Sequence, residues 1–76
     1  MVFPREVLNE LKWRYDSLDE AEITYVHRGA PGDIMTIKGA AIVALGRSFF
    51  DTGDATIPYH RIVRIIWKGT LVFGKY

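Results

Sequence analysis

The sequence is organised around one corner, Ile57-Pro58-Tyr59-His60-Arg61-Ile62. Pro58 fixes its own φ and pushes the residue before it into an extended conformation. The corner leads directly into residues 62–67, the most apolar run in the C-terminal half of the chain. A rigid corner ahead of a buried strand holds polar side chains in a fixed direction. We therefore interpret His60 and Arg61 as candidate binding residues.

A second His-Arg pair, His27-Arg28, ends another β-like run just ahead of Gly29. Arginine presents a fork of fixed donors to a phosphate, histidine can add a hydrogen bond, and glycine lets a ligand approach the backbone. An exposed tyrosine can stack on an unpaired base. The candidate phosphate- and RNA-binding site is therefore His27, Arg28, Gly29, Tyr59, His60 and Arg61, with Lys38 and Arg64 as secondary candidates.

Strand alternation leaves open whether the two pairs meet. Successive side chains of a strand point to opposite faces, so His27 shares a face with Tyr25 and Arg28 lies on the other. His60 and Arg61 diverge in the same way if a strand has already begun there. One residue of each pair could therefore serve the edge of the core rather than the site.

Length and composition indicate one small globular domain, residues 1–76. Apolar residues make up 49% of the chain, too many for a disordered segment, and 76 residues leave no room for a second core. Cysteine is absent, which fits a reducing cytoplasm. No signal peptide and no apolar run of membrane-spanning length is visible. We expect a soluble, cytoplasmic protein.

The net charge of +1 is too small to drive nucleic-acid binding through the field of the whole molecule. The charges are nevertheless unevenly distributed, because the acids gather in the first third and none follows residue 54. All charged residues of the C-terminal segment, residues 55–76, are basic, namely Arg61, Arg64, Lys68 and Lys75. This basic segment suits an anionic partner, but it is equally typical of a solvated strand face balanced by an acidic helix.

Hydrophobic spacing predicts one helix followed by strands. Residues 3–15 place their apolar side chains on one stripe, with Trp13 off the stripe and at the rim of a sheet. Strands are predicted at 22–28 and 34–38 around a type II turn at 30–33, at 47–51, and in a hairpin of 61–67 with 70–75. Residues 40–45 are a strand or a short helix, and flanking glycines favour the strand. The predicted fold class is α+β, with one N-terminal helix packed on a mainly antiparallel sheet of about five strands that can curl toward a barrel.

Four motifs together resemble one family. They are Leu11-x-Trp13, His27-Arg28-Gly29-Ala30-Pro31-Gly32-Asp33, Ile37-x-Gly39 and Ile57-Pro58-Tyr59-His60-Arg61-Ile62, of which the last is the most specific. The family is a small, mostly archaeal set of uncharacterised proteins whose domain is proposed to recognise cyclic-phosphate RNA ends. The resemblance covers nearly the whole chain. It implies a context of RNA processing, since related domains occur fused to phosphoesterase or nucleotidyltransferase-like modules, and this chain resembles the recognition module alone.

These observations predict an RNA-binding module that holds a phosphorylated or cyclic-phosphate 3′ end, in RNA processing or repair, with an RNA-processing enzyme as a further partner. No cofactor or metal is expected, because two lone histidines lack a third ligand at a suitable spacing. No catalytic residue is assigned, since no serine lies in a recognisable nucleophile motif. Two alternatives stay open. A small metal-independent phosphoesterase or RNase could use the paired histidines for proton transfer, and a protein-interaction module could use a sheet edge or the aromatic rim.

Overall fold

The computed structural model describes residues 3–29 and 31–74. One α-helix and seven strands make up its regular structure. The helix is α1 (Pro4–Trp13), and the strands are β1 (Ala21–Val26), β2 (Ile34–Lys38), β3 (Ala44–Leu45), β4 (Phe49–Asp51), β5 (Thr56–Pro58), β6 (Ile62–Trp67) and β7 (Thr70–Gly74). Four 3₁₀ turns connect them, namely η1 (Leu18–Glu20), η2 (Pro31–Asp33), η3 (Gly39–Ala41) and η4 (Tyr59–Arg61). In the described part of the chain, no helix is long and apolar enough to cross a membrane.

Helix α1 forms where its sequence pattern predicts it. Proline at the start of the helix is well tolerated, because the first N–H groups have no partner within the helix. The predicted apolar stripe is buried through Val7, Leu8 and Leu11. Trp13, predicted to lie off this stripe, is the last residue of the helix and is 74% exposed. The Lys12 ammonium lies 5.0 Å from the centre of its ring.

The larger sheet has four antiparallel strands in the order β2-β1-β6-β7. Strand β1 lies at its centre, and Ile23 pairs with Ile37 on one side and with Ile65 on the other. The predicted hairpin of β1 with β2 is confirmed. Gly32 in its loop has φ 70° and ψ 8°, as the third position of a type II turn requires. Two residues of the predicted elements, Ala30 of this turn and Lys75 of the last strand, lie outside the described residues.

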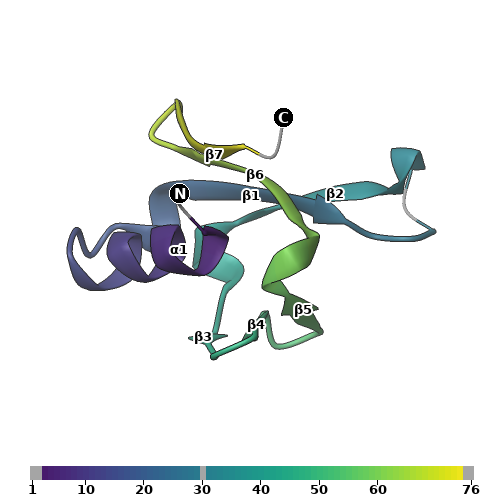
Figure 1. Ribbon diagram of the computed structural model, residues 1–76, viewed down its shortest axis with the longest axis horizontal. Coiled ribbons are helices and arrows are strands. Elements are labelled where there is room, and N and C mark those ends of the chain that lie inside the picture. The colour runs from purple at the N-terminus through teal and green to yellow at the C-terminus, as the bar shows by residue number, and fades with distance from the viewer. Residues whose placement is uncertain (1–2, 30, 75–76) are drawn as a thin grey trace.

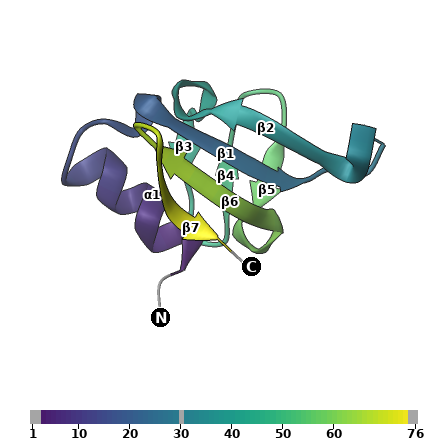
Figure 2. The ribbon, with the colours of Figure 1, turned by 90° about the horizontal axis from the view of Figure 1, so that it is seen from above.

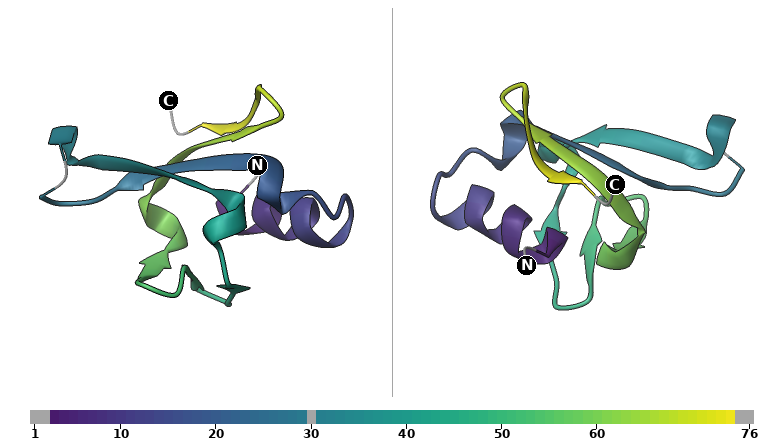
Figure 3. Two further views of the ribbon diagram at one scale, coloured as in Figure 1. Left: turned by 180° about the vertical axis from the view of Figure 1, so that it is seen from behind. Right: turned by 45° about the horizontal axis from the view of Figure 1, so that its top comes forward.

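The smaller sheet, in the order β3-β4-β5, lies on the same side of the larger sheet as α1 (Figures 1 and 2). The opposite side of the larger sheet carries no other helix or strand of the described chain (Figure 3, left). The core fills the space between these layers. Phe50 of β4 is fully buried there, and its ring centre lies 6.5 Å from that of Tyr25 and 5.8 Å from that of Tyr59. This one side chain therefore joins the two sheets.

Three expectations about the strands were wrong. The described residues form seven strands in two sheets rather than about five in one. The sheets do not close into a barrel, because the chain leaves the larger sheet at η3, returns to it at η4, and leaves β2 and β7 as its edges. Residues 40–45 are mainly a 3₁₀ turn and extended chain, with a strand only at Ala44–Leu45. Ile42 and Leu45 both pack on the core, and a spacing of three residues cannot bring both to one face of a strand.

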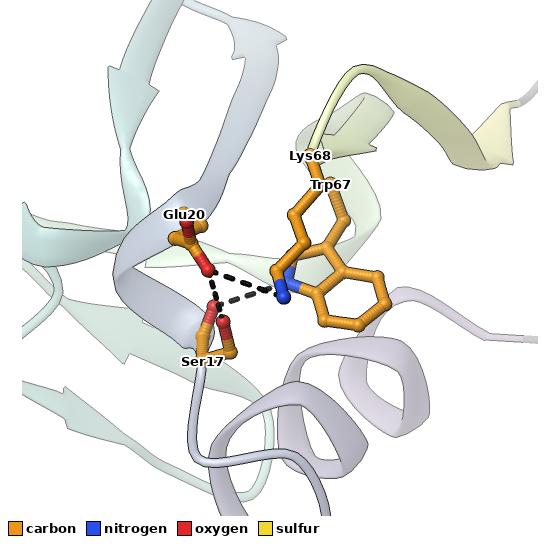
Figure 4. A network of polar contacts seen from close by, with 4 residues as sticks. All are labelled: Ser17, Glu20, Trp67 and Lys68. Atoms are coloured by element: carbon orange, nitrogen blue, oxygen red, sulfur yellow. Dashed lines mark hydrogen bonds and ion pairs between the residues drawn. The ribbon is translucent and has the colours of Figure 1, made fainter.

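A polar network ties η1 to the hairpin of β6 with β7 (Figure 4). The Ser17 hydroxyl donates to Glu20 Oε2 at 2.7 Å, and Lys68 Nζ lies 3.4 Å from the same carboxylate oxygen. Trp67 Nε1 donates to the Ser17 carbonyl at 3.1 Å. The hydrogen bond from Ser17 and then the charge of Lys68 hold the pKa of Glu20 below its usual range.

Candidate nucleic-acid interface

The candidate site is built around η4, the turn formed by the corner recognised in the sequence. Pro58 ends β5 with φ −64° and ψ 140°, and the Ile62 N–H donates to the Tyr59 carbonyl. A 3₁₀ turn contains three residues, so Tyr59 and Ile62 lie on the same side, where they are 7% and 0% exposed. His60 and Arg61 lie between them and are exposed. The turn therefore presents two adjacent polar side chains to solvent.

Arg61 lines a cleft of about 490 Å³ together with His27. This His27–Arg61 cleft lies between the hairpin of β1 with β2 and the turn that joins β4 to β5. Its walls combine apolar side chains with polar ones, namely Tyr25, His27, Met35, Ile37, Ala41, Thr52, Asp54, Ala55, Thr56, Ile57 and Arg61. The His27 ring contacts the Tyr25 ring edge-on, with 6.2 Å between centres. The His27 N–H donates to the Asp33 carbonyl at 2.8 Å, which closes the loop beside the cleft.

His60 lines a different cavity, of about 380 Å³, which shares no lining residue with the cleft. We call it the Arg5–Arg47 cavity. Three separate segments form it, the first turn of α1, the loop between β3 and β4, and η4. Its lining residues are Phe3, Pro4, Arg5, Glu6, Arg47, Ser48, Tyr59 and His60. Its lining residues include two guanidinium groups, one imidazole and one carboxylate.

The arginines of both cavities keep their charge available for a ligand. Within residues 3–29 and 31–74, ion pairs join Arg14 to Glu10, Lys38 to Glu22 and Lys68 to Glu20. Arg5, Arg47 and Arg61 are in none of them. Guanidinium groups without a carboxylate partner can form bidentate hydrogen bonds with phosphate oxygens.

Comparison with known proteins identifies the family. Residues 1–75 match the family described as the MJ1316 RNA cyclic group end recognition domain. The chain belongs to this family. Among similar proteins, a UPF0248 protein of Thermococcus onnurineus is 43% identical over 84% of this chain and 74% of its own length. A UPF0248 protein of Methanococcus maripaludis is 35% identical over 82% of each chain. No solved structure matches the chain.

In this family member, the predicted site residues fall into several places. His27 and Arg61 line one cleft, and Tyr59 and His60 line the other cavity. Arg28 and Gly29 are exposed in the loop that follows β1. The two histidines therefore do not line a common cavity, and the paired-histidine phosphoesterase gains no support from the arrangement.

Tyr59 has little surface with which to stack on a base. Its side chain is 7% exposed, its ring packs on Phe50, and its hydroxyl donates to the Gly46 carbonyl at 2.8 Å. Burial raises the pKa of the Tyr59 hydroxyl, and the nearby charge of Arg5 opposes that shift. Tyr59 thus forms a wall of the Arg5–Arg47 cavity rather than an open stacking surface.

The secondary candidates lie on the uncovered face of the larger sheet. Lys38 is paired with Glu22 on that face, with 3.7 Å between Nζ and Oε2. Arg64 stands opposite Thr24 in the sheet and lines a mainly apolar groove with it. Neither side chain lines the His27–Arg61 cleft or the Arg5–Arg47 cavity.

Sequence reasoning missed Arg5 and Arg47. Arg5 reads as an ordinary first-turn residue of a helix, and Arg47 was predicted to begin the strand 47–51, whereas it lies in the loop before β4. Only the packing of α1 beside the loop between β3 and β4 brings them to one cavity, and no local pattern signals that convergence. No group of three or more His, Cys, Asp or Glu residues within the described ranges could hold a metal ion.

Proposed function

We propose that this domain binds the phosphorylated or cyclic-phosphate end of an RNA strand, in RNA processing or repair, and that the end lies in the His27–Arg61 cleft. The family assignment supports RNA end recognition as the class of function. The placement in the cleft rests on the chemistry of its walls.

One observation carries the proposal, namely that the His27 imidazole and the Arg61 guanidinium, neither of which is in an ion pair within the described ranges, line the same cleft of about 490 Å³. Small-molecule sites have volumes of roughly 300–1,000 Å³, mostly apolar walls and a few fixed polar groups. The cleft has this composition. Met35, which is 44% exposed, and Ile37 offer an apolar surface to a terminal base, while His27 and Arg61 donate hydrogen bonds to its phosphate. Asp54 can accept a hydrogen bond from a hydroxyl or an amino group of the nucleotide.

The other predicted residues contribute from outside the cleft. Arg28 follows His27 directly and adds a second guanidinium beside the end phosphate. Gly29 has no side chain to obstruct the strand. His60, the residue before Arg61 in η4, contacts the strand outside the cleft, and Tyr59 holds the turn in place from within.

The test compares RNAs of one sequence that end in a cyclic phosphate, a 3′-phosphate or free hydroxyls, by fluorescence anisotropy. We expect both phosphate forms to bind more tightly than the hydroxyl form, and affinity to fall with salt because phosphate contacts release counterions. Arg61→Ala is expected to cost about 1.5–3 kcal/mol of binding free energy, the usual value for hydrogen bonds to charged groups. Arg61→Lys restores the charge without the fork and recovers only part of the loss.

Arg14→Ala is the matched control, because it removes one positive charge at the far end of α1, where Arg14 pairs with Glu10. It should leave end discrimination unchanged. Arg28→Ala combined with Arg61→Ala should cost less than the sum of the single losses if both hold one phosphate. Equal affinity for all three RNA ends would refute end recognition, and cleavage of the cyclic-phosphate RNA would instead favour an enzyme.

A further inference from the structure

We propose that the Arg5–Arg47 cavity is a second phosphate subsite, which holds an internal phosphodiester of the same RNA strand whose end occupies the His27–Arg61 cleft. The inference rests on the proposed function for the choice of ligand. It adds that the domain requires a polynucleotide and not only a terminal nucleotide.

The charge of the cavity is the first argument. Arg5 and Arg47 come from segments far apart in the sequence and line the same space of about 380 Å³. Neither is in an ion pair in the part of the chain that the structure describes. Glu6 is the one carboxylate among the lining residues, so the cavity is positive on balance. An internal phosphodiester carries a single negative charge and two acceptor oxygens, which two guanidinium groups can satisfy together.

The rigidity of the cavity is the second argument. Three hydrogen bonds fix the loop that carries Arg47. The Gly46 N–H donates to the Phe49 carbonyl at 2.9 Å, the Tyr59 N–H to the Ser48 carbonyl at 3.2 Å, and the Tyr59 hydroxyl to the Gly46 carbonyl at 2.8 Å. The loop is thereby bound to η4. A guanidinium on a fixed loop loses less conformational freedom when it binds a phosphate.

Proximity to the cleft is the third argument. His60 lines the cavity and Arg61 lines the cleft, and these residues are consecutive in one turn. A strand whose end is held beside Arg61 can therefore reach the cavity by crossing this one turn. Phe3 is 53% exposed at the cavity, so its ring is accessible for stacking on the base next to the held phosphodiester.

The experiment uses two ligands with the same end. One is a nucleoside 2′,3′-cyclic monophosphate, which has the end group and no internal phosphodiester. The other is a short oligonucleotide with the same terminal nucleotide and cyclic phosphate. Both are titrated against the wild type, Arg47→Ala, Arg5→Ala and the control Arg14→Ala, and thermal melts confirm that each variant folds.

We expect Arg47→Ala to weaken oligonucleotide binding about tenfold or more and to leave mononucleotide binding unchanged. The slope of log affinity against log salt should become shallower by about 0.7, the value for one phosphate contact on a single strand. Arg5→Ala should show the same ligand dependence, so the inference does not depend on one variant. Arg61→Ala should weaken both ligands.

Equal losses for the two ligands in Arg47→Ala would overturn the inference, because the cavity would then hold the end itself. An unchanged oligonucleotide affinity in both arginine variants would overturn it as well. If the proposed function is wrong and the subsite exists, the result is different from both of these. Oligonucleotides with phosphate and hydroxyl ends would then bind equally, while Arg47→Ala would still weaken both, which supports the subsite and removes only end recognition.

Discussion

Truncation of Phe50 should weaken the packing between the two sheets and so lower the stability of the domain. Its side chain is fully buried and contacts the rings of Tyr25 and Tyr59. Replacing a buried phenylalanine by alanine typically costs about 3–5 kcal/mol, through lost apolar transfer and the cavity left behind. A domain of 76 residues has a total unfolding free energy of roughly 4–11 kcal/mol. Phe50→Ala is therefore expected to remove a large part of the stability.

The assay is thermal and urea unfolding followed by circular dichroism, with Phe49→Ala as the matched control. Phe49 is the preceding residue of the same strand, but 47% of its side chain is exposed. Since 1 kcal/mol shifts the Tm of a domain this small by about 4–8 °C, Phe50→Ala should lower Tm by roughly 12–40 °C and Phe49→Ala by far less. Similar losses in the two variants would refute the assignment of Phe50 as the residue that joins the sheets.

Three further predictions concern single residues. A Cβ at Gly39 would overlap the Leu18 carbonyl, so Gly39→Ala should lower the unfolding free energy by about 1–3 kcal/mol in urea titrations, whereas Ala40→Ser, at the exposed neighbour, should not. Tyr59→Phe removes the hydroxyl bonded to a backbone carbonyl and keeps the ring; a loss of about 0.5–1.5 kcal/mol is expected, and an unchanged urea midpoint would contradict it. The lowered pKa of Glu20 means that its carboxylate stabilises the fold above its unfolded pKa and that this contribution is lost as pH falls through the folded pKa. Glu20→Gln should therefore show a smaller drop in Tm between pH 7 and about pH 3 than the wild type, and equal drops would count against the network in Figure 4.

Local patterns predicted most of the helix and the larger sheet. The stripe of α1, the alternation of β1 and the glycine of its turn act over a few residues, so the sequence shows them directly. Alternation also placed His27 on the face of Tyr25, and the two side chains indeed line one cleft. The same reasoning does not apply to His60 and Arg61, because they lie in a 3₁₀ turn and not in a strand.

Tertiary packing determined the parts of the structure that local patterns did not predict. Residues 40–45 have no period of their own, because Ile42 and Leu45 are placed by the core and not by local alternation. The short strand β5 was missed, because its pairing with β4 is formed across a turn and its last residue is a proline. The Arg5–Arg47 cavity was missed for the same kind of reason, since its arginines meet only after α1 has docked.

The geometry of η4 also fixes the spacing between the two cavities that we propose as phosphate-binding positions. His60 and Arg61 are joined by one peptide unit, so their Cα atoms are about 3.8 Å apart whatever the surrounding loops do. Inserting one residue into the turn would rotate the following side chains by about 120°, because three residues complete a 3₁₀ turn. The side chain that faces the cleft would then face elsewhere. Insertions in the loop between β1 and β2, in contrast, leave the separation of His60 and Arg61 intact. The length of that loop can therefore change without altering the distance between the two proposed phosphate-binding positions.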